Sequence, residues 1–188
     1  MKQIKFARTG YILISVLFYL SGIICIIIPE IDSKTAALAG GLILIIYGII
    51  KITGYLSKDL YCLAFQYDFA CGLFLIVLGT VVLVAGNGFK GHLLSGLGVL
   101  VLLDSLLSIQ TSIDSKKFGL SSWPVILSSS ILSGALGVAL IVTNTQLIAG
   151  CSLLAEGFMR HYIVRCTVYL SSDYNPSSRE QKYEDTYL

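Results

Sequence analysis

Four ionisable side chains lie inside the most apolar stretches of this chain, and their chemistry needs explaining first. Two are acids and two are bases: Asp104, Glu156, Lys51 and Arg160. A charged side chain in the middle of an apolar layer costs about 2.5 kcal/mol or more, so such residues usually have a role. We therefore treat these four residues as the candidate polar site.

Two interpretations of this candidate site are open. In the functional one, Asp104 and Glu156 face the cytoplasm and change their protonation state, while the two bases balance their charge. In the structural one, Glu156 pairs with Arg160 four residues along the same helix. Lys51 then extends its ammonium group to the lipid headgroups. Asp104 hydrogen-bonds to serines of its own helix or to a neighbouring helix.

The composition places these residues in a membrane protein. Of the 188 residues, 55% are hydrophobic and 13% are charged, and the mean hydropathy is +0.82. A soluble domain carries about a quarter of its residues as Asp, Glu, Lys or Arg. Most of this surface must therefore contact lipid, and the lipid bilayer is the expected partner. The net charge of +2 does not suggest nucleic-acid binding.

Long charge-free runs indicate helices that cross the bilayer, since a crossing helix needs about 20 mostly apolar residues. We predict six of them, at residues 10–29, 35–55, 65–86, 91–112, 124–143 and 145–163. The runs are continuously apolar and lack the two-residue alternation of a β-barrel wall. The expected fold is an all-α membrane protein with six transmembrane helices, arranged as three repeated helical hairpins.

An internal repeat supports the three hairpins. The first helix of each pair carries small or helix-ending residues at seven-residue steps: Ser15, Gly22 and Pro29; Gly72, Gly79 and Gly86; Ser130, Gly137 and Asn144. Gly22 to Gly79 is 57 residues and Gly79 to Gly137 is 58 residues. A constant period of this size indicates one supersecondary unit made three times.

The second helices carry the same seven-residue step. It joins Gly41 to Gly48, Leu97 to Asp104, and Gly150 to Gly157. Residues seven apart lie on nearly the same helix face, and small residues let helices approach closely in lipid. We expect the helices to pack at these glycines: Gly22, Gly41, Gly48, Gly72, Gly79, Gly137, Gly150 and Gly157. A ligand groove along the glycines is the alternative.

At this point the chain resembles a known family, the HdeD-like acid-resistance membrane proteins. The matching features are the Gly22–Pro29 end of the first helix, the glycine-rich segment Gly41–Gly48, the threefold repetition and the length. The chain departs from the family where Gly86 and Asn144 replace the proline, and in its polar tail. The resemblance implies an inner-membrane protein, linked in some members to acid stress, and brings no catalytic residues.

The basic residues predict the orientation in the membrane. Eleven Lys and Arg residues, with Lys51 and Arg160 among them, fall at the end that holds the N-terminus, and two, Lys34 and Lys90, at the other. Because basic residues stay on the cytoplasmic side, we expect a multi-pass cell-membrane protein with both termini in the cytoplasm. The predicted organisation is a basic N-terminus 1–9, repeat 10–55, linker 56–64, repeat 65–112, linker 113–123, repeat 124–163 and polar cytoplasmic tail 164–188.

No cofactor, metal or catalytic residue is expected. The five cysteines show no CxxC spacing, and histidine is too scarce for an obvious zinc set. The sequence contains no nucleophile elbow, phosphate-binding glycine loop or HExxH motif. We therefore expect a protein that is not an enzyme. Of the two histidines, His92 is the better candidate for a pH sensor, because it lies near the outer end of its helix.

Three functions compete for this chain. The first is a non-enzymatic HdeD-like membrane protein that supports tolerance of acid or envelope stress. The second is a small channel or transporter with a polar site near Asp104 and Glu156, which requires a cavity that reaches those carboxyl groups. The third is an assembly or lipid-binding partner of another membrane complex. Apart from the bilayer, the candidate partners are a second copy of this chain in a homo-oligomer or another membrane protein. A centre filled by side chains favours the first function over the second.

Overall fold

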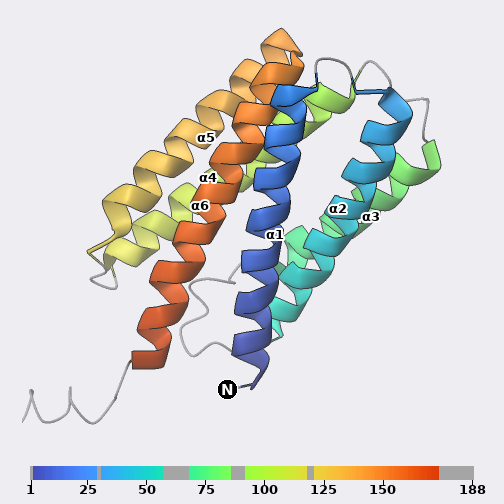
Figure 1. Cartoon of the computed structure of the whole chain (residues 1–188). Coiled ribbons are helices and arrows are strands. Elements are labelled where there is room, and N and C mark those ends of the chain that lie inside the picture. Colours follow the sequence, from blue (N-terminus) through green and yellow to red (C-terminus); the bar gives the residue numbers. More distant parts are fainter. Residues whose placement is uncertain (1, 29–30, 57–67, 86–91, 118–120, 174–188) are drawn as a thin grey trace, which may run out of the picture.

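The computed structural model describes residues 2–28, 31–56, 68–85, 92–117 and 121–173, and the backbone alone for residues 2–8, 33 and 167–173. In this part of the chain every regular element is an α-helix (Figure 1). The helices are α1 (Lys2–Ile27), α2 (Ser33–Tyr55), α3 (Asp68–Ala85), α4 (Leu93–Lys117), α5 (Trp123–Thr143) and α6 (Gln146–Asp173). The start of α1 and the end of α6 lie at the same end of the bundle.

Five of these helices are long and apolar enough to cross a membrane. Their apolar segments are Thr9–Ile27, Lys34–Tyr55, Asp68–Ala85, Leu93–Lys117 and Trp123–Thr143. They agree with five of the six predicted spans. The exception is α6, since Glu156, Arg160 and His161 interrupt its apolar run. The crossing by α6 stays a prediction.

The helix ends follow local chemistry where they are described. Asn144 ends α5 in a left-handed conformation with φ 50°, and its N–H donates to the carbonyl oxygen of Leu140 at 2.9 Å. Asparagine tolerates this conformation because its short polar side chain bonds locally. The predicted helix-ending residues Pro29 and Gly86 lie outside the described residues, as do most of linker 56–64 and of the polar tail.

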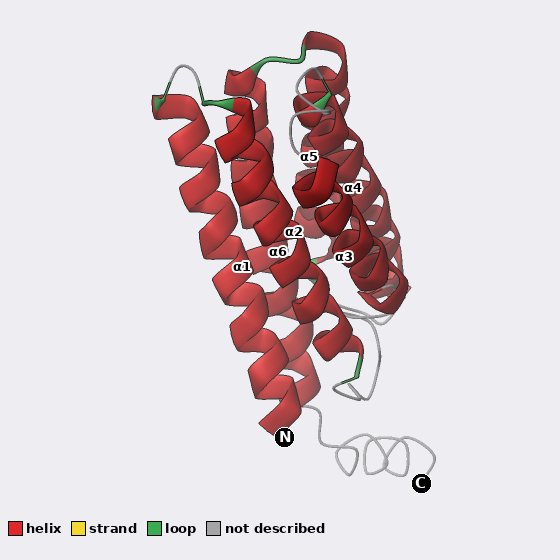
Figure 2. Ribbon diagram, turned by 90° about the vertical axis from the view of Figure 1, so that its right-hand side faces the viewer, coloured by secondary structure: helices red, strands yellow, loops and turns green. Residues whose placement is uncertain are grey.

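The helices pair differently from the predicted hairpins. The closest pairs are α2 with α3, α4 with α5, and α1 with α6 (Figures 1 and 2). The second helix of each repeat thus packs against the first helix of the next repeat, and α6 returns to α1. Helices that follow each other along the chain are therefore not always the ones that pack most closely. The faces with small residues decide which backbones touch. Each repeat therefore packs mainly against its neighbouring repeats. Within the repeats, α5 and α6 still contact each other and α1 and α2 do so less, whereas α3 and α4 are not closely packed.

Glycines allow the backbones of α2 and α3 to touch. A β-carbon added to Gly48 would lie 2.6 Å from the carbonyl oxygen of Gly72, and one added to Gly79 would lie 2.8 Å from that of Gly41. A backbone oxygen this close cannot move aside without shifting a helix. Any larger residue at these positions would separate the two helices.

The same contact recurs in the other two pairs. A β-carbon added to Gly22 would lie 2.9 Å from the carbonyl oxygen of Gly150, and one added to Gly157 would lie 3.1 Å from that of Ser15. Gly137 of α5 faces α4 at a comparable distance. All eight glycines named from the sequence thus lie at contacts between helices.

The structure corrects the register of the second repeat. The sequence pattern aligned Leu97 and Asp104 with the glycine pairs of the other repeats, whereas Gly98 and Ser105 make the contact with α5. One residue corresponds to a rotation of about 100° about the helix axis. This rotation turns Leu97 and Asp104 toward an interior cavity instead.

Small polar residues lie inside the bundle beside its apolar core, and large apolar residues also cover its outside. Eight serines are at most 3% exposed: Ser15, Ser105, Ser108, Ser112, Ser115, Ser130, Ser133 and Ser152. Each helix also presents large exposed apolar side chains, among them Leu20, Leu42, Val77, Leu103, Leu132 and Phe158. An apolar surface of this extent marks contact with a membrane. The bilayer is accordingly the medium that this surface fits.

Candidate functional site

The candidate site lies at one level of the bundle, where the three repeats place equivalent residues. We call it the charge cluster and define it as Lys51, Asp68, Asp104, Glu156 and Arg160. One residue before the second small residue of α2, α4 and α6 come Tyr47, Asp104 and Glu156. Three residues after the same small residue come Lys51, Ser108 and Arg160.

The first helices of the repeats contribute a third set of equivalent positions. Four residues before the first small residue of α1, α3 and α5 come Tyr11, Asp68 and Ile126. All nine side chains therefore point inward at corresponding positions.

Lys51 of α2 is fixed inside the cluster. Its side chain is 3% exposed, and its Nζ donates to Asp68 Oδ1 at 2.8 Å and lies 3.5 Å from Asp104 Oδ1. Its ammonium group also lies 5.0 Å from the centre of the Tyr47 ring. The structural interpretation expected Lys51 to reach the lipid headgroups, and this expectation is wrong. The two nearby carboxylates replace the water that the ammonium group loses.

Arg160 of α6 pairs with another helix and not with its own. Its Nη2 donates to Asp104 Oδ2, and its guanidinium carbon lies 5.5 Å from the centre of the Tyr47 ring. The expected ion pair with Glu156 is absent from the ion pairs of the described residues. Because Asp104 accepts from Arg160 and approaches Lys51, it joins α4 to both α6 and α2.

Asp68 was missed in the sequence because it directly precedes the charge-free run 69–89 and lies in the first turn of the predicted helix 65–86. It is 4% exposed and accepts hydrogen bonds from Lys51 and from the Tyr11 hydroxyl. The repeat contained the missing signal. Asp68 stands four residues before Gly72, as Tyr11 stands four residues before Ser15, so both had to face the interior.

The charge cluster contains one more carboxyl group than it has cationic groups, and the carboxyl group without an ion pair is that of Glu156. Glu156 is 4% exposed, and Ser133 Oγ donates to its Oε1 at 2.5 Å. No ion pair among the described residues includes Glu156. With every member ionised, the charge cluster has three negative and two positive groups, so it carries one uncompensated negative charge. One proton or one added cation would make it neutral.

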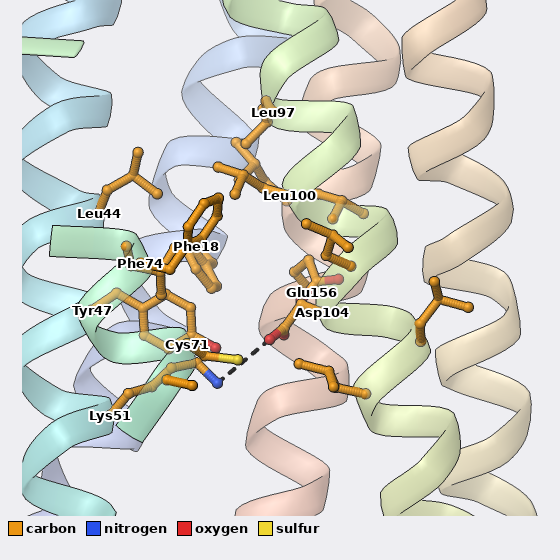
Figure 3. Close-up of a pocket in the computed structure, with 17 residues that line it drawn as sticks. Phe18, Leu44, Tyr47, Lys51, Cys71, Phe74, Leu97, Leu100, Asp104 and Glu156 are labelled. Carbon is orange, nitrogen blue, oxygen red and sulfur yellow. Dashed lines mark ion pairs between the residues drawn. The ribbon is translucent and has the colours of Figure 1, made fainter. Parts of the chain in front are cut away.

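A cavity of about 450 Å³ reaches the charge cluster (Figure 3). It lies between α3 and α4, which are not among the closely packed helix pairs of the described bundle. Its polar end is formed by Tyr47, Lys51, Asp104 and Glu156, and Leu97 lies toward the other end. The first of the three functions is favoured by a centre filled with side chains, and the centre of the bundle instead contains this cavity. A cavity that reaches both carboxyl groups is what the channel or transporter requires.

Tyr47 adds an unsatisfied polar group to this end of the cavity. It is 4% exposed, and its hydroxyl has no hydrogen-bond partner in the described part of the chain. A buried hydroxyl without a partner loses about 1–3 kcal/mol relative to one that is bonded. The cavity thus contains a polar group that a ligand could satisfy.

The remaining candidate residues lie apart from this site. His92 and His161 are exposed, so a pH-sensing role for His92 stays a prediction. Within the described residues, no group of three or more His, Cys, Asp or Glu side chains is arranged to hold a metal ion. Four of the cysteines, Cys25, Cys71, Cys151 and Cys166, are free thiols, and Cys62 lies outside the described residues.

The fold and the buried site define a multi-span helical membrane protein. Residues 13–84 match the family described as a short repeat of unknown function (DUF308). The matched segment covers most of the apolar part of α1, all of α2 and nearly all of α3, that is, most of the first repeat and of the first helix of the second. No curated protein and no solved structure matches the chain.

Proposed function

We propose that this chain is a non-enzymatic membrane protein of the HdeD-like type, in which the charge cluster takes up and releases a proton when the cell envelope acidifies. In this role the protein supports tolerance of acid or envelope stress. The observation that carries the proposal is the excess carboxyl group of Glu156, buried beside a cavity. A single proton changes the charge of the cluster from minus one to zero.

Protonation at this site would act on helix packing. Glu156 contacts Ser133 of α5, while Asp104 joins α4 to α2 and α6. A change of one charge in a region without bulk water alters every nearby electrostatic interaction. Protonation would therefore change how strongly α4 is held to its neighbouring helices.

The test compares neutral variants of the two carboxyl groups. We expect Asp104→Asn and Glu156→Gln to reduce survival of acid stress in cells that depend on this protein, or to change proton leak across their membrane. The control is Asp114→Asn, because Asp114 lies outside the cluster and pairs with Lys117 of its own helix at 3.0 Å. Wild-type behaviour of both cluster variants would reject the protonation site.

The proposal includes a sixth crossing by α6, with both termini in the cytoplasm. The charged groups of α6 that interrupt its apolar run are Glu156 and Arg160, and both are buried against other helices. Of the eleven basic residues that the sequence pattern assigns to the cytoplasmic side, nine remain when Lys51 and Arg160, which lie in the cluster, are left out. Reporters fused to the two termini should both respond on the cytoplasmic side, and opposite sides would contradict the sixth crossing.

A small channel or transporter is the second candidate function. It is favoured by the cavity of about 450 Å³ that reaches Asp104 and Glu156. Purified protein in liposomes that contain a pH-sensitive dye separates the two functions. A steady proton flux above that of empty liposomes supports the channel or transporter. Acid-dependent survival without flux supports a protein that responds to protons and does not conduct them.

A further inference from the structure

We propose that the cavity between α3 and α4 binds an apolar organic cation that enters from the membrane and places its charge beside Glu156 and Asp104. We call this cavity the α3–α4 slot. The inference rests on the proposed protonation site, because the cation and the proton would neutralise the same excess charge.

The apolar lining of the slot favours a ligand that is itself mostly apolar. Most of its lining residues are apolar and come from α3 and α4, among them Phe74, Leu97, Leu100, Leu103 and Leu107. The volume of about 450 Å³ lies within the usual range of about 300–1,000 Å³ for pockets that hold small molecules. A polar solute would lose its hydration in such a slot without gaining hydrogen bonds along most of its length.

The charge cluster selects a positive ligand. Glu156 accepts a hydrogen bond from Ser133 of α5 and shares the lining of the slot with Tyr47 and Lys51 of α2, Cys71 of α3 and Asp104 of α4. The other members of the cluster are Asp68 of α3, to which Tyr11 of α1 donates, and Arg160 of α6. Lys51 and Arg160 are already paired with Asp68 and Asp104. An anion would add a second uncompensated charge, whereas a cation would remove the first.

Tyr47 gives an independent indication that a ligand belongs at this end. Its buried hydroxyl has no described partner, and the residue lines the slot next to Lys51 (Figure 3). A hydroxyl oxygen accepts hydrogen bonds as well as donating them. An ammonium ligand could therefore donate to it, and any bound cation would be attracted by its dipole.

The slot can be reached from the side of the bundle. Phe74, Leu103 and Leu106 line it and are also about half exposed on the outer surface. The outer surface of the described helices is the surface that fits lipid. An apolar cation that dissolves in the bilayer would therefore meet the opening between α3 and α4 without passing through water.

The test uses tetraphenylphosphonium as the probe and tetraphenylborate as its control, since the two ions share shape and size and differ in charge. Binding to the purified full chain in lipid nanodiscs is measured by titration calorimetry against empty nanodiscs. We expect saturable binding of the phosphonium in neutral buffer and none of the borate. In mildly acidic buffer the affinity should fall by about tenfold, within the range usual for coupling between two ligands.

Two variants separate the charge from the cavity. Glu156→Gln removes the excess charge and should weaken phosphonium binding by about tenfold or more. Leu103→Trp fills the mouth of the slot and leaves the cluster intact, so it should weaken binding without removing a charge. The matched control is Leu132→Trp, since Leu132 is exposed on α5 and does not line the slot.

The outcomes distinguish this inference from the proposed function. Saturable borate binding, or phosphonium binding that neither variant changes, overturns the cation site. If the phosphonium does not bind while Asp104→Asn and Glu156→Gln alter acid survival, the protonation site stands and the ligand assignment is wrong. If the phosphonium binds equally in neutral and acidic buffer, the cation site stands and the protonation site is wrong.

Discussion

Arg160 of α6 donates a hydrogen bond to Asp104 of α4, and the two side chains come from different repeats. Asp104 also lies 3.5 Å from Lys51 of α2, so one carboxylate connects three helices. The same carboxyl group lines the α3–α4 slot. The interaction that holds the repeats together therefore also forms part of the candidate site.

We predict that Asp104 and Arg160 depend on each other for stability. Replacing either partner alone, with Asp104→Asn or Arg160→Gln, leaves a buried charge without its partner and should cost about 3–5 kcal/mol. The double variant should cost clearly less than the sum of the single variants. Thermal unfolding in detergent measures all three proteins. The exposed pair Asp114–Lys117 is the control, and removing it should change stability by at most about 1 kcal/mol.

Lys51 should behave as a buried counter-ion. We expect Lys51→Met to destabilise the protein strongly, because three carboxyl groups then share one cation. Adding Asp68→Asn should restore part of the stability, since it removes the carboxylate bonded to Lys51 at 2.8 Å. Lys34→Met on the exposed start of the same helix serves as the control. Equal effects of Lys51→Met and Lys34→Met on the unfolding temperature would contradict a buried counter-ion.

The glycine contacts predict a sharp difference between two positions on α2. Gly48→Ala places a β-carbon 2.6 Å from the carbonyl oxygen of Gly72 and should separate α2 from α3. Gly40→Ala meets nothing within 4 Å, so it should stabilise the helix by about 0.5–1 kcal/mol. Thermal unfolding of the two variants provides the measurement. If Gly48→Ala were as stable as Gly40→Ala, the described α2–α3 contact would be wrong.

Ser133 should tune the charge cluster through Glu156. Ser133→Ala removes the hydrogen bond of 2.5 Å to Glu156 and should cost about 1.5–3 kcal/mol, the range for bonds to charged groups. It also removes a donor that favours the charged carboxylate, so acid should act on the variant at a higher pH than on the wild type. The control Ser128→Ala removes an exposed serine that bonds only to the backbone of its own helix. Identical acid profiles for Ser133→Ala and the wild type would show that this bond does not affect the proton.

The local features of the bundle could be predicted from residue types. For most of the helix ends, the boundary predicted from the apolar runs lies within one or two helical turns of the described boundary. The small residues lie where helices touch. Asp104, Glu156, Lys51 and Arg160 stood out because a charge in an apolar run is unusual wherever the helix packs. Asp68 did not stand out, because it borders such a run, and only its position relative to Gly72 indicates that it faces inward.

The amino-acid sequence by itself determined that this is an apolar, helical, threefold-repeated chain with ionisable groups inside its spans, because these properties depend on composition and period alone. The tertiary structure decided which helices pair, which face of α4 meets α5, and that a cavity reaches the carboxyl groups. Three similar repeats offer similar contact faces, so the sequence cannot distinguish the partner within a hairpin from the partner in the next repeat. The free energy of close backbone packing makes that choice, and it opens the space between α3 and α4 where the candidate site lies.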